Sequence, residues 1–313
     1  MTRGHGRRAI GLLCLHAVGV SACGPLGRVG PASAGSWQRR AGLNTPRDDF
    51  GAAVVRGRLY VAGGMSGERG NDLDTTEVYE PGANAWTRGP RLPAATSSLR
   101  AAGVGADVFV TGGAVRSGEV DHTWRLVGAA GQWERGAPLR AARMGHGLAA
   151  IDGGVVAAGG LSRGEAIAAV EQLDLEPGTW SERSPLPAPR FNLALVAAGR
   201  QLYAIGGSGP DRRPTTSVFV YDSVADRWSD APPLPQPVSN FGAAMLGGRI
   251  HVLLHKHHFS LRPGGATWTL HPPMPTSRHG HGLEALGGAL YAVGGCSEDP
   301  QRDLPTVEAF RPG

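Results

Sequence analysis

The sequence has few cysteines, and its N-terminal apolar run is too short to cross a membrane. The three cysteines are Cys14, Cys23 and Cys296, and the first two lie in a segment that we interpret below as an export signal. The mature domain then keeps a single cysteine, so no intradomain disulfide is expected. The apolar run covers residues 9–22, whereas a membrane-spanning helix needs about 20 residues. Stability must therefore come from packing and from closure of the fold.

The mature domain also lacks an excess of either positive or negative charge, although the whole chain has a pI near 9.5. The first 35 residues contain no acid and four of the 31 basic residues, namely Arg3, Arg7, Arg8 and Arg28. Without them, 27 basic residues stand against 26 acidic ones. This near balance gives no electrostatic case for binding nucleic acid.

Glycine and proline are abundant, with 49 and 24 residues, but apolar residues still make up 41% of the chain. Enough apolar surface is present to form a core, so disorder is not expected and the glycines belong in turns. A length of 313 residues would suggest two domains at about 150 residues each, but all-β folds often run longer as one unit.

The first 35 residues have the layout of an export signal. Arg7 and Arg8 precede the apolar run, which ends in residues 20–24, Val-Ser-Ala-Cys-Gly. This ending resembles the lipobox of bacterial lipoproteins, which implies that Cys23 carries lipid and anchors an exported, periplasmic or cell-surface protein. Cleavage after residues 32–34, Ala-Ser-Ala, would instead release a secreted protein. We assign residues 1–35 to the signal and a short linker, and 36–313 to the mature domain.

Double glycines recur along the chain and reveal internal repeats. The first members of the pairs are Gly63, Gly112, Gly159, Gly206 and Gly294, so the intervals are 49, 47, 47 and 88 residues. The last interval is close to two periods. Residues 249–254 align with residues 58–63 but have lost the glycines, and they supply a hidden fifth repeat.

Each repeat is expected to form four short antiparallel strands. In the first, strands are predicted at residues 51–55, 58–62 and 76–79 and around Trp86, with a hairpin turn at residues 56–57. A tryptophan falls in the second half of five repeats, with Tyr or Leu seven residues before it: Trp86, Trp133, Trp180, Trp228 and Trp268. The pattern resembles the kelch repeat over about residues 37–313. The resemblance implies an all-β, six-bladed kelch β-propeller.

The two ends of the chain are expected to complete one blade. The last repeat stops at residues 307–313 without a fourth strand, and Trp37 has no first half of a repeat before it. Pairing these segments would close the ring and remove its exposed edges. We therefore predict that the N-terminal strand belongs to the last blade.

Four arginines occupy one point of the repeat, 16 residues before the double glycine: Arg47, Arg143, Arg190 and Arg278. Blades two and five have Thr96 and Val238 there. We predict an incomplete arginine ring at one channel mouth, and the kelch resemblance implies that it binds an acidic peptide or another anion. In the alternative interpretation, each arginine pairs with acids or carbonyls of neighbouring turns.

Blade five is degenerate and rich in histidine. Its loop between the second and third strands shrinks to residues 255–258, His-Lys-His-His, and His251, His271, His279 and His281 lie nearby. Imidazoles can bind metal, but no carboxylate or cysteine completes a recognised ligand spacing. We interpret the segment as a decayed repeat and predict neither a metal nor a cofactor.

Two functions remain open. A non-catalytic scaffold would bind a protein or an acidic ligand at one face of the propeller, whereas a carbohydrate-active propeller would resemble the exported sialic-acid mutarotases. For the second, Asp48 and Asp49, or Asp211 and Arg212, could supply acid, base and sugar-binding groups. The copper chemistry of galactose oxidase needs a cross-linked cysteine, and Cys296 directly follows a structural double glycine. The chain contains no Ser-His-Asp order, phosphate loop or metalloprotease motif, so the scaffold is the first hypothesis.

Overall fold

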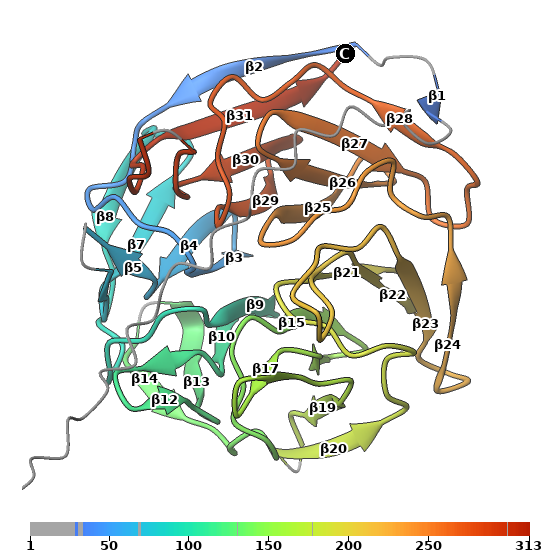
Figure 1. The fold of residues 1–313 in the computed structure, drawn as a ribbon. Coiled ribbons are helices and arrows are strands. Elements are labelled where there is room, and N and C mark those ends of the chain that lie inside the picture. The colour runs from blue at the N-terminus through green and yellow to red at the C-terminus, as the bar shows by residue number, and fades with distance from the viewer. Residues whose placement is uncertain (1–28, 31–33, 68–69, 130, 177, 299) are drawn as a thin grey trace, which may run out of the picture.

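Six β-sheets stand around one central axis in the computed structural model of the chain (Figure 1). The structure describes residues 29–30, 34–67, 70–129, 131–176, 178–298 and 300–313. Cys23 and nearly all of the predicted export signal lie outside these residues. Within them, no helix has the length and apolar character needed to cross a membrane. The predicted all-β, six-bladed propeller is confirmed.

Every blade contains four antiparallel strands, and their order runs from the axis outward. The innermost strands are β3 (Gly51–Val55), β9 (Arg100–Val104), β15 (Gly147–Ile151), β21 (Ala194–Ala198), β25 (Gly242–Leu246) and β29 (Gly282–Leu286). The second strands are β4 (Arg58–Ala62), β10 (Asp107–Thr111), β16 (Gly154–Ala158), β22 (Gln201–Ile205), β26 (Arg249–Leu254) and β30 (Ala289–Val293). The third strands are β7 (Thr76–Glu80), β13 (Thr123–Leu126), β19 (Val170–Asp174), β23 (Val218–Asp222), β27 (His257–Leu261) and β31 (Val307–Pro312). The outer strands are β8 (Ala85–Arg88), β14 (Trp133–Arg135), β20 (Thr179–Arg183), β24 (Arg227–Ala231), β28 (Trp268–Leu270) and β2 (Gly35–Arg40).

Smaller elements decorate this frame. The loops after the second strands of blades one to three form two-stranded hairpins, β5 (Met65–Ser66) with β6 (Asn71–Asp72), β11 (Ala114–Val115) with β12 (Gly118–Glu119), and β17 (Leu161–Ser162) with β18 (Glu165–Ala166). A short 3-10 turn, η1 (Val127–Ala129), follows β13. The strand β1 (Val29–Gly30) lies in the predicted linker and pairs in parallel with β28, which gives blade five a fifth strand.

The N-terminal strand closes the ring as predicted. Strand β2 pairs with β31 in antiparallel register, and Trp37 lies opposite Phe310. Trp37 Nε1 donates a hydrogen bond to the carbonyl of Pro272, in the link that leads out of blade five, at 3.1 Å. The five other repeat tryptophans make the equivalent bond to a carbonyl of the preceding link, at 2.8–3.1 Å. Trp37 is therefore the sixth member of the tryptophan series.

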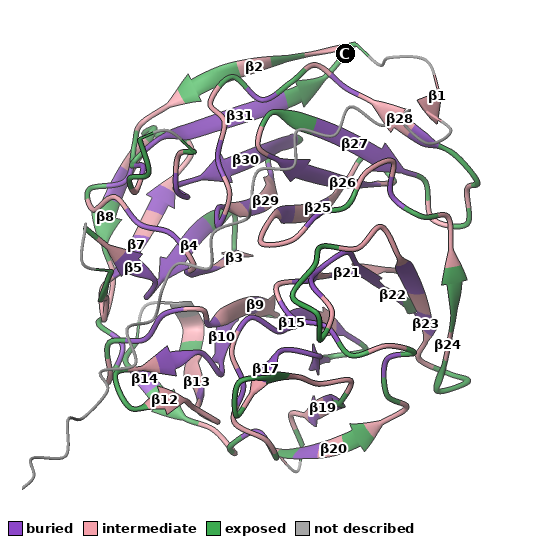
Figure 2. Cartoon of the chain, in the orientation of Figure 1, coloured by how far each residue is buried: buried purple, intermediate pink, exposed green. Residues whose placement is uncertain are grey.

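The strands bury their middle portions and expose the outermost edge. Figure 2 shows the second strands almost wholly buried, whereas β2, β20 and β24 carry exposed residues. Apolar clusters lie between adjacent blades: Tyr60, on β4, belongs to the same cluster as Leu99 and Val108 of blade two. The alternation of the strands presents one face of each blade to each neighbour, so the core is a set of blade interfaces.

Double glycines mark the points of closest approach between blades. A Cβ atom added to Gly63 would lie 2.5 Å from the carbonyl oxygen of Thr96 in blade two, and φ is already +66° there. The next residue, Gly64, donates its N–H to that same carbonyl at 2.9 Å. In blade five, His255 takes the place of the second glycine, with φ of 53°, and donates to the carbonyl of Arg278 at 2.9 Å. The backbone bond thus survives in the degenerate blade.

A closed ring of backbone hydrogen bonds surrounds the axis at one face. Each member lies two residues after the arginine position of its repeat, has φ between 49° and 60°, and donates its N–H to the carbonyl of the member in the previous blade at 2.6–3.0 Å. The members are Asp49, Ser98, Gly145, Asn192, Asn240 and Gly280. Glycine, asparagine and aspartate suit this left-handed conformation. We call this the axial ring, and we call its side of the propeller the loop face, because the loops after the second strands lie there too.

Candidate functional site

The four predicted arginines lie inside the blades and not on a surface. Arg47, Arg143, Arg190 and Arg278 expose 0–2% of their area. In each, Nη1 donates to the carbonyl of the first glycine of its own blade's pair, at 2.8–3.1 Å, and to a carbonyl at the start of the third strand, at 2.7–3.2 Å. The guanidinium group therefore ties the second strand to the third strand behind the glycine pair.

Buried glutamates complete three of the four arginine sites. Arg47 Nη2 contacts Glu77 at 2.8 Å, and Arg143 and Arg278 form buried ion pairs with Glu171 and Glu308. Burial lowers the pKa of these three arginines, and the charge of the paired glutamate raises it in part. In the fourth, Arg190 stacks over Phe219, with Cζ 4.3 Å from the ring centroid, and burial lowers its pKa to about 10.

These contacts revise the predicted ligand role. Ligand binding needs guanidinium donors that face an open surface, and these four groups are buried and bonded to their own blades. The arrangement matches the alternative interpretation, in which the arginines pair with acids and carbonyls. The four arginines do occupy equivalent positions of the repeat, as predicted, but their side chains point into the blades and not toward the channel mouth. We therefore propose no binding role for these arginines.

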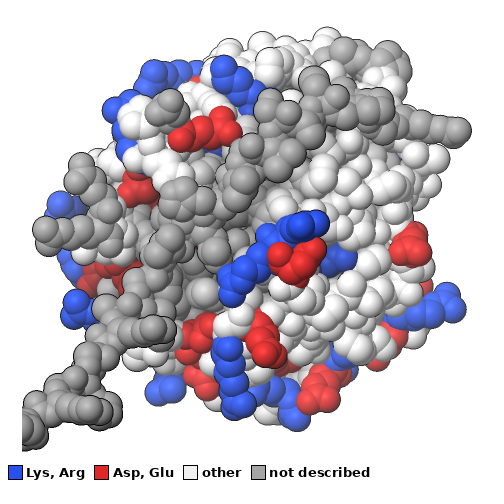
Figure 3. Space-filling model, in the orientation of Figure 1, with Lys and Arg blue, Asp and Glu red and all other residues white. Residues whose placement is uncertain are grey.

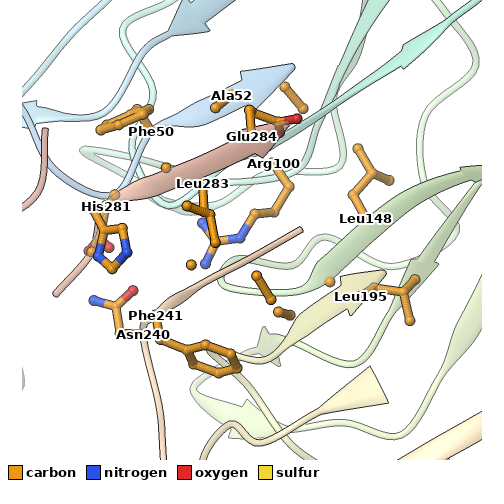
Figure 4. A pocket seen from close by; sticks show the side chains of 18 of the residues that line it. Phe50, Ala52, Arg100, Leu148, Leu195, Asn240, Phe241, His281, Leu283 and Glu284 are labelled. Atoms are coloured by element: carbon orange, nitrogen blue, oxygen red, sulfur yellow. The ribbon is translucent and has the colours of Figure 1, made fainter. Parts of the chain in front are cut away.

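An axial pocket of ≈ 100 Å³ lies at the loop face beside the axial ring. Its polar side chains are Asp49, Arg100, Asn240, His281 and Glu284. Figure 4 shows Arg100 reaching into the pocket on the side lined by His281 and Asn240, while Glu284 lies nearer Ala52. The other lining residues are mostly glycine, alanine, leucine and phenylalanine. The pocket therefore combines small and apolar residues with five polar side chains, and polar atoms make up most of its exposed surface.

Arg100 and Glu284 are exceptions within the repeat. Strand pairing places Arg100 at the first residue of its inner strand, where the five other blades have only glycine or alanine: Gly51, Gly147, Ala194, Gly242 and Gly282. At the register of Glu284 the other blades have Ala53, Ala102, Ala149, Val196 and Ala244. Alignment of the six inner strands would have shown both residues, and our sequence reading missed them because it followed the glycines and tryptophans.

Burial shapes the charges of this axial pocket. It lowers the pKa of Arg100, although the charge of Asp49 opposes the shift, and it raises the pKa of Glu284 to about 8. Burial also holds the pKa of His281 well below its usual value, with further lowering by Arg278. The only side-chain hydrogen bond of Arg100 among the described residues runs from Nη1 to the carbonyl of Leu99, at 3.0 Å. The guanidinium group of Arg100 therefore has further N–H donors available for a ligand.

The raised pKa of Glu284 predicts a pH-dependent stability difference. In the folded state Glu284 keeps its proton up to about pH 8, whereas in the unfolded state it ionises near the ordinary glutamate pKa of 4.5, so wild type loses stability as pH rises between these values. Glu284→Gln removes this loss. We expect the melting temperature of E284Q to exceed that of wild type by several degrees more at pH 8 than at pH 5. The exposed Glu134→Gln should show no such trend, and a pH-independent E284Q difference would contradict the burial of a neutral carboxyl.

A second cavity of ≈ 250 Å³ continues the pocket along the axis and shares Glu284 with it. Alanine, glycine, valine, leucine and methionine make up the rest of its described lining. Polar atoms, from Glu284 and from the backbone of these small residues, nevertheless make up more of its exposed surface than apolar atoms do.

The residues considered for a carbohydrate site do not come together. Asp49 lines the axial pocket, but Asp48 is buried beside Cys296 and Asp303, where burial first, and then the charges of Asp49 and Asp303, raise its pKa to about 9. Asp211 and Arg212 are exposed in the loop of blade four and do not line the axial pocket. The predicted acid–base groups are thus spread over three environments.

Comparison with known proteins matches the Kelch motif to residues 46–93, 189–235 and 277–313. Each match begins one residue before a buried arginine and runs through blade one, four or six. The three matched blades are kelch repeats. The buried arginine, the glycine pair and the tryptophan are thus parts of one kelch scaffold, and the kelch repeats predicted from the sequence are confirmed.

Curated kelch proteins match parts of the chain. It is 33% identical over 101 residues to Kelch-like protein 40 of Mus musculus, which covers 30% of this chain and 16% of that protein. It is 37% identical over 83 residues to Kelch-like protein 35 of Homo sapiens, with 26% of this chain and 14% of that protein covered. The matches thus cover about a sixth or less of the length of these relatives. They support the repeat and carry no activity over.

Proposed function

We propose that this kelch propeller is an exported, lipid-anchored binding scaffold that holds a protein partner on its loop face, with an acidic side chain of the partner in the axial pocket. The observation that carries the proposal is Arg100, a half-buried cation that reaches into the pocket (Figure 4) and makes one side-chain hydrogen bond within the part of the chain that the structure describes. A guanidinium that faces a pocket favours a carboxylate, because its planar fork can bind both oxygens.

Pocket size favours a side chain over a whole small molecule. Sites for drug-sized ligands usually measure about 300–1,000 Å³. The axial pocket has ≈ 100 Å³, which suits one carboxylate group with part of its stem, and the cavity that continues it has ≈ 250 Å³. A carbohydrate-active propeller would use both volumes and the polar side chains of the pocket, and the sugar probe below tests this alternative.

The loop face offers a partner surface of mixed charge. Figure 3 shows basic and acidic side chains interspersed over the visible part of the molecule, without a field of one sign. Loops of different length rise from the blades around the axial ring, and these could give contacts specific to one partner. Mixed polar surface around a small central anchor is typical of protein interfaces.

Peptide probes test the binding role. We expect acetyl-Gly-Glu-Gly-amide at millimolar concentration to raise the melting temperature, and its Gln counterpart to have no effect. Arg100→Met should abolish the shift, whereas Arg212→Met, an exposed arginine outside the pocket, should retain it. No shift from the acidic peptide, or an equal shift in R100M, would overturn the proposal. A shift from N-acetylneuraminate alone would favour the carbohydrate alternative.

Cys23 carries the proposed lipid anchor. In a bacterial host, wild type should sediment with membranes and show the mass of a diacylated N-terminal cysteine, while Cys23→Ser should lose both properties. If wild type is instead found in the soluble fraction and begins at residue 35, the protein is secreted without a lipid anchor and the proposal is wrong.

A further inference from the structure

Three histidines of blade five converge although they are far apart in the sequence. His251 lies on β26, His258 on β27 and His271 just after β28, and one ring nitrogen of each lies within 4.8 Å of the others. All three residues are at least 95% buried. His251 Nδ1 is 2.9 Å from His258 Nε2, and the rings of His258 and His271 stack with centroids 4.4 Å apart. We call these residues the imidazole trio.

From this geometry we propose that the imidazole trio binds one divalent transition-metal ion of the zinc type. Neutral imidazole is a favoured ligand of Zn²⁺, Cu²⁺ and Ni²⁺, and three histidines make a known type of zinc site. Two nitrogens on one tetrahedral Zn²⁺, each about 2.0–2.1 Å from the ion, lie about 3.3 Å apart. To reach this spacing, the hydrogen-bonded nitrogens of His251 and His258 would move apart by a few tenths of an ångström, and one of the stacked rings of His258 and His271 would turn so that its lone pair faces the ion.

His271 already has the outer partner that a metal ligand requires. Its Nε2 lies 2.7 Å from Ser260 Oγ, while its Nδ1 is buried without a hydrogen-bond partner among the described residues. When Ser260 Oγ accepts the Nε2 proton, Nδ1 is left with its lone pair. Metal-bound histidines typically donate their other N–H to such a neighbour. Arg249 fixes Ser260 by donating to Oγ at 2.7 Å, although its charge opposes a nearby cation.

The trio is enclosed within the molecule. Burial, and after it the charges of neighbouring residues, lowers the pKa of His251 to about 3, of His258 to about 2 and of His271 to about 4. Phe310 and Trp37 of the closing blade cover His258, with centroids 4.6 and 5.8 Å away, so an ion would enter while the chain folds or opens locally.

Repeat decay alone does not account for the trio. No other blade has histidine at any of the three positions: the equivalents of His258 are Thr76, Thr123, Val170, Val218 and Val307. At the position of His251 the other blades have tyrosine, phenylalanine or valine, and at that of His271 they have glycine, alanine or arginine. Three separate changes, on β26, on β27 and just after β28, have thus placed histidines side by side.

Refolding with metal tests the site. We expect the full chain, unfolded with a chelator and refolded with Zn²⁺ or Co²⁺, to retain about one ion after desalting, measured by mass spectrometry of the metal. The Co²⁺ form should show the intense visible absorption of a four-coordinate ion. His258→Val and His271→Ala, which introduce residues used in other blades, should weaken binding at least about 100-fold. His257→Gln, an exposed neighbour on β27, should bind as wild type does.

Two results would overturn the proposal. The first is wild type that refolds, as judged by circular dichroism, yet retains neither ion. The second is either of the two trio variants binding as much metal as wild type, since the ion would then lie elsewhere. The variants test two different ligands, so failure of one to fold leaves the other decisive.

Discussion

Deleting residues 36–42 is expected to lower the melting temperature of the propeller by about 10 °C or more. The deletion removes most of β2, frees the edge of β31 and exposes Phe310, which is fully buried in the intact ring. Burial of one large apolar side chain contributes about 1.5–3 kcal/mol, and Trp37 and the strand pairing add to it. A loss of several kcal/mol shifts the melting temperature of a large domain by about 2–4 °C per kcal/mol.

Thermal unfolding followed by circular dichroism measures this effect. Ser36→Ala and Gln38→Ala, in one variant, are the matched control, because both side chains are exposed on β2 and the strand itself stays. The control should melt within about a degree of wild type. A truncated chain that does the same would show that the ring does not depend on its N-terminal strand.

The fold was predictable because its repeated residues have backbone roles that tolerate few substitutes. Gly63 and its equivalents allow blades to approach within contact distance, and Trp86 and its equivalents bond to the preceding link. Such demands recur once per blade, so they leave a period of about 47 residues in the sequence. Blade five lost the glycines but kept the strand register, and for that reason residues 249–254 could still be aligned.

The direction of the arginine side chains could not be read from their period. A repeated position tells which residues are equivalent, but both a channel-facing and a buried arginine would repeat in the same way. The signal that could have shown the direction was the acidic residue with which the arginine pairs. Arg47 pairs with Glu77, and where the arginine is lost the acid is lost too, since Thr96 accompanies Trp124 and Val238 accompanies Phe259.

The candidate sites lie at positions where one blade has a different type of residue from the other five. Arg100 stands among small residues of the inner strands, and the imidazole trio stands among residues that are not histidine in any other blade. The sequence shows the histidines only as a cluster around residues 251–281. Their convergence depends on the register of β26, β27 and β28, which the short distance to Trp268 obscured.

Arg143→Met is expected to destabilise the protein by about 3–5 kcal/mol, measured by urea unfolding. Glu171 would remain buried without its cation, and the carbonyls of Gly159 and Ala169 would lose a donor. Removing one member of a buried ion pair typically has a cost of this size. The double variant Arg143→Met/Glu171→Leu should recover part of the loss, because no buried charge then remains unpaired.

Two other arginines show whether the buried charge pair is the cause. Arg58→Met breaks an exposed pair with Glu80, whose side chains are 54% and 44% exposed, and should change stability by no more than about 1 kcal/mol. Arg190→Met removes a buried arginine that has no glutamate partner, so it should cost less than Arg143→Met. Two results together would contradict the role of the charge pair: equal losses of stability in R143M and R190M, and no recovery when Glu171→Leu is added to R143M. The bonds to the carbonyls would then account for the shared geometry of the buried arginines in blades one, three, four and six. The buried glutamates would contribute only the free-energy cost of removing their charge from water.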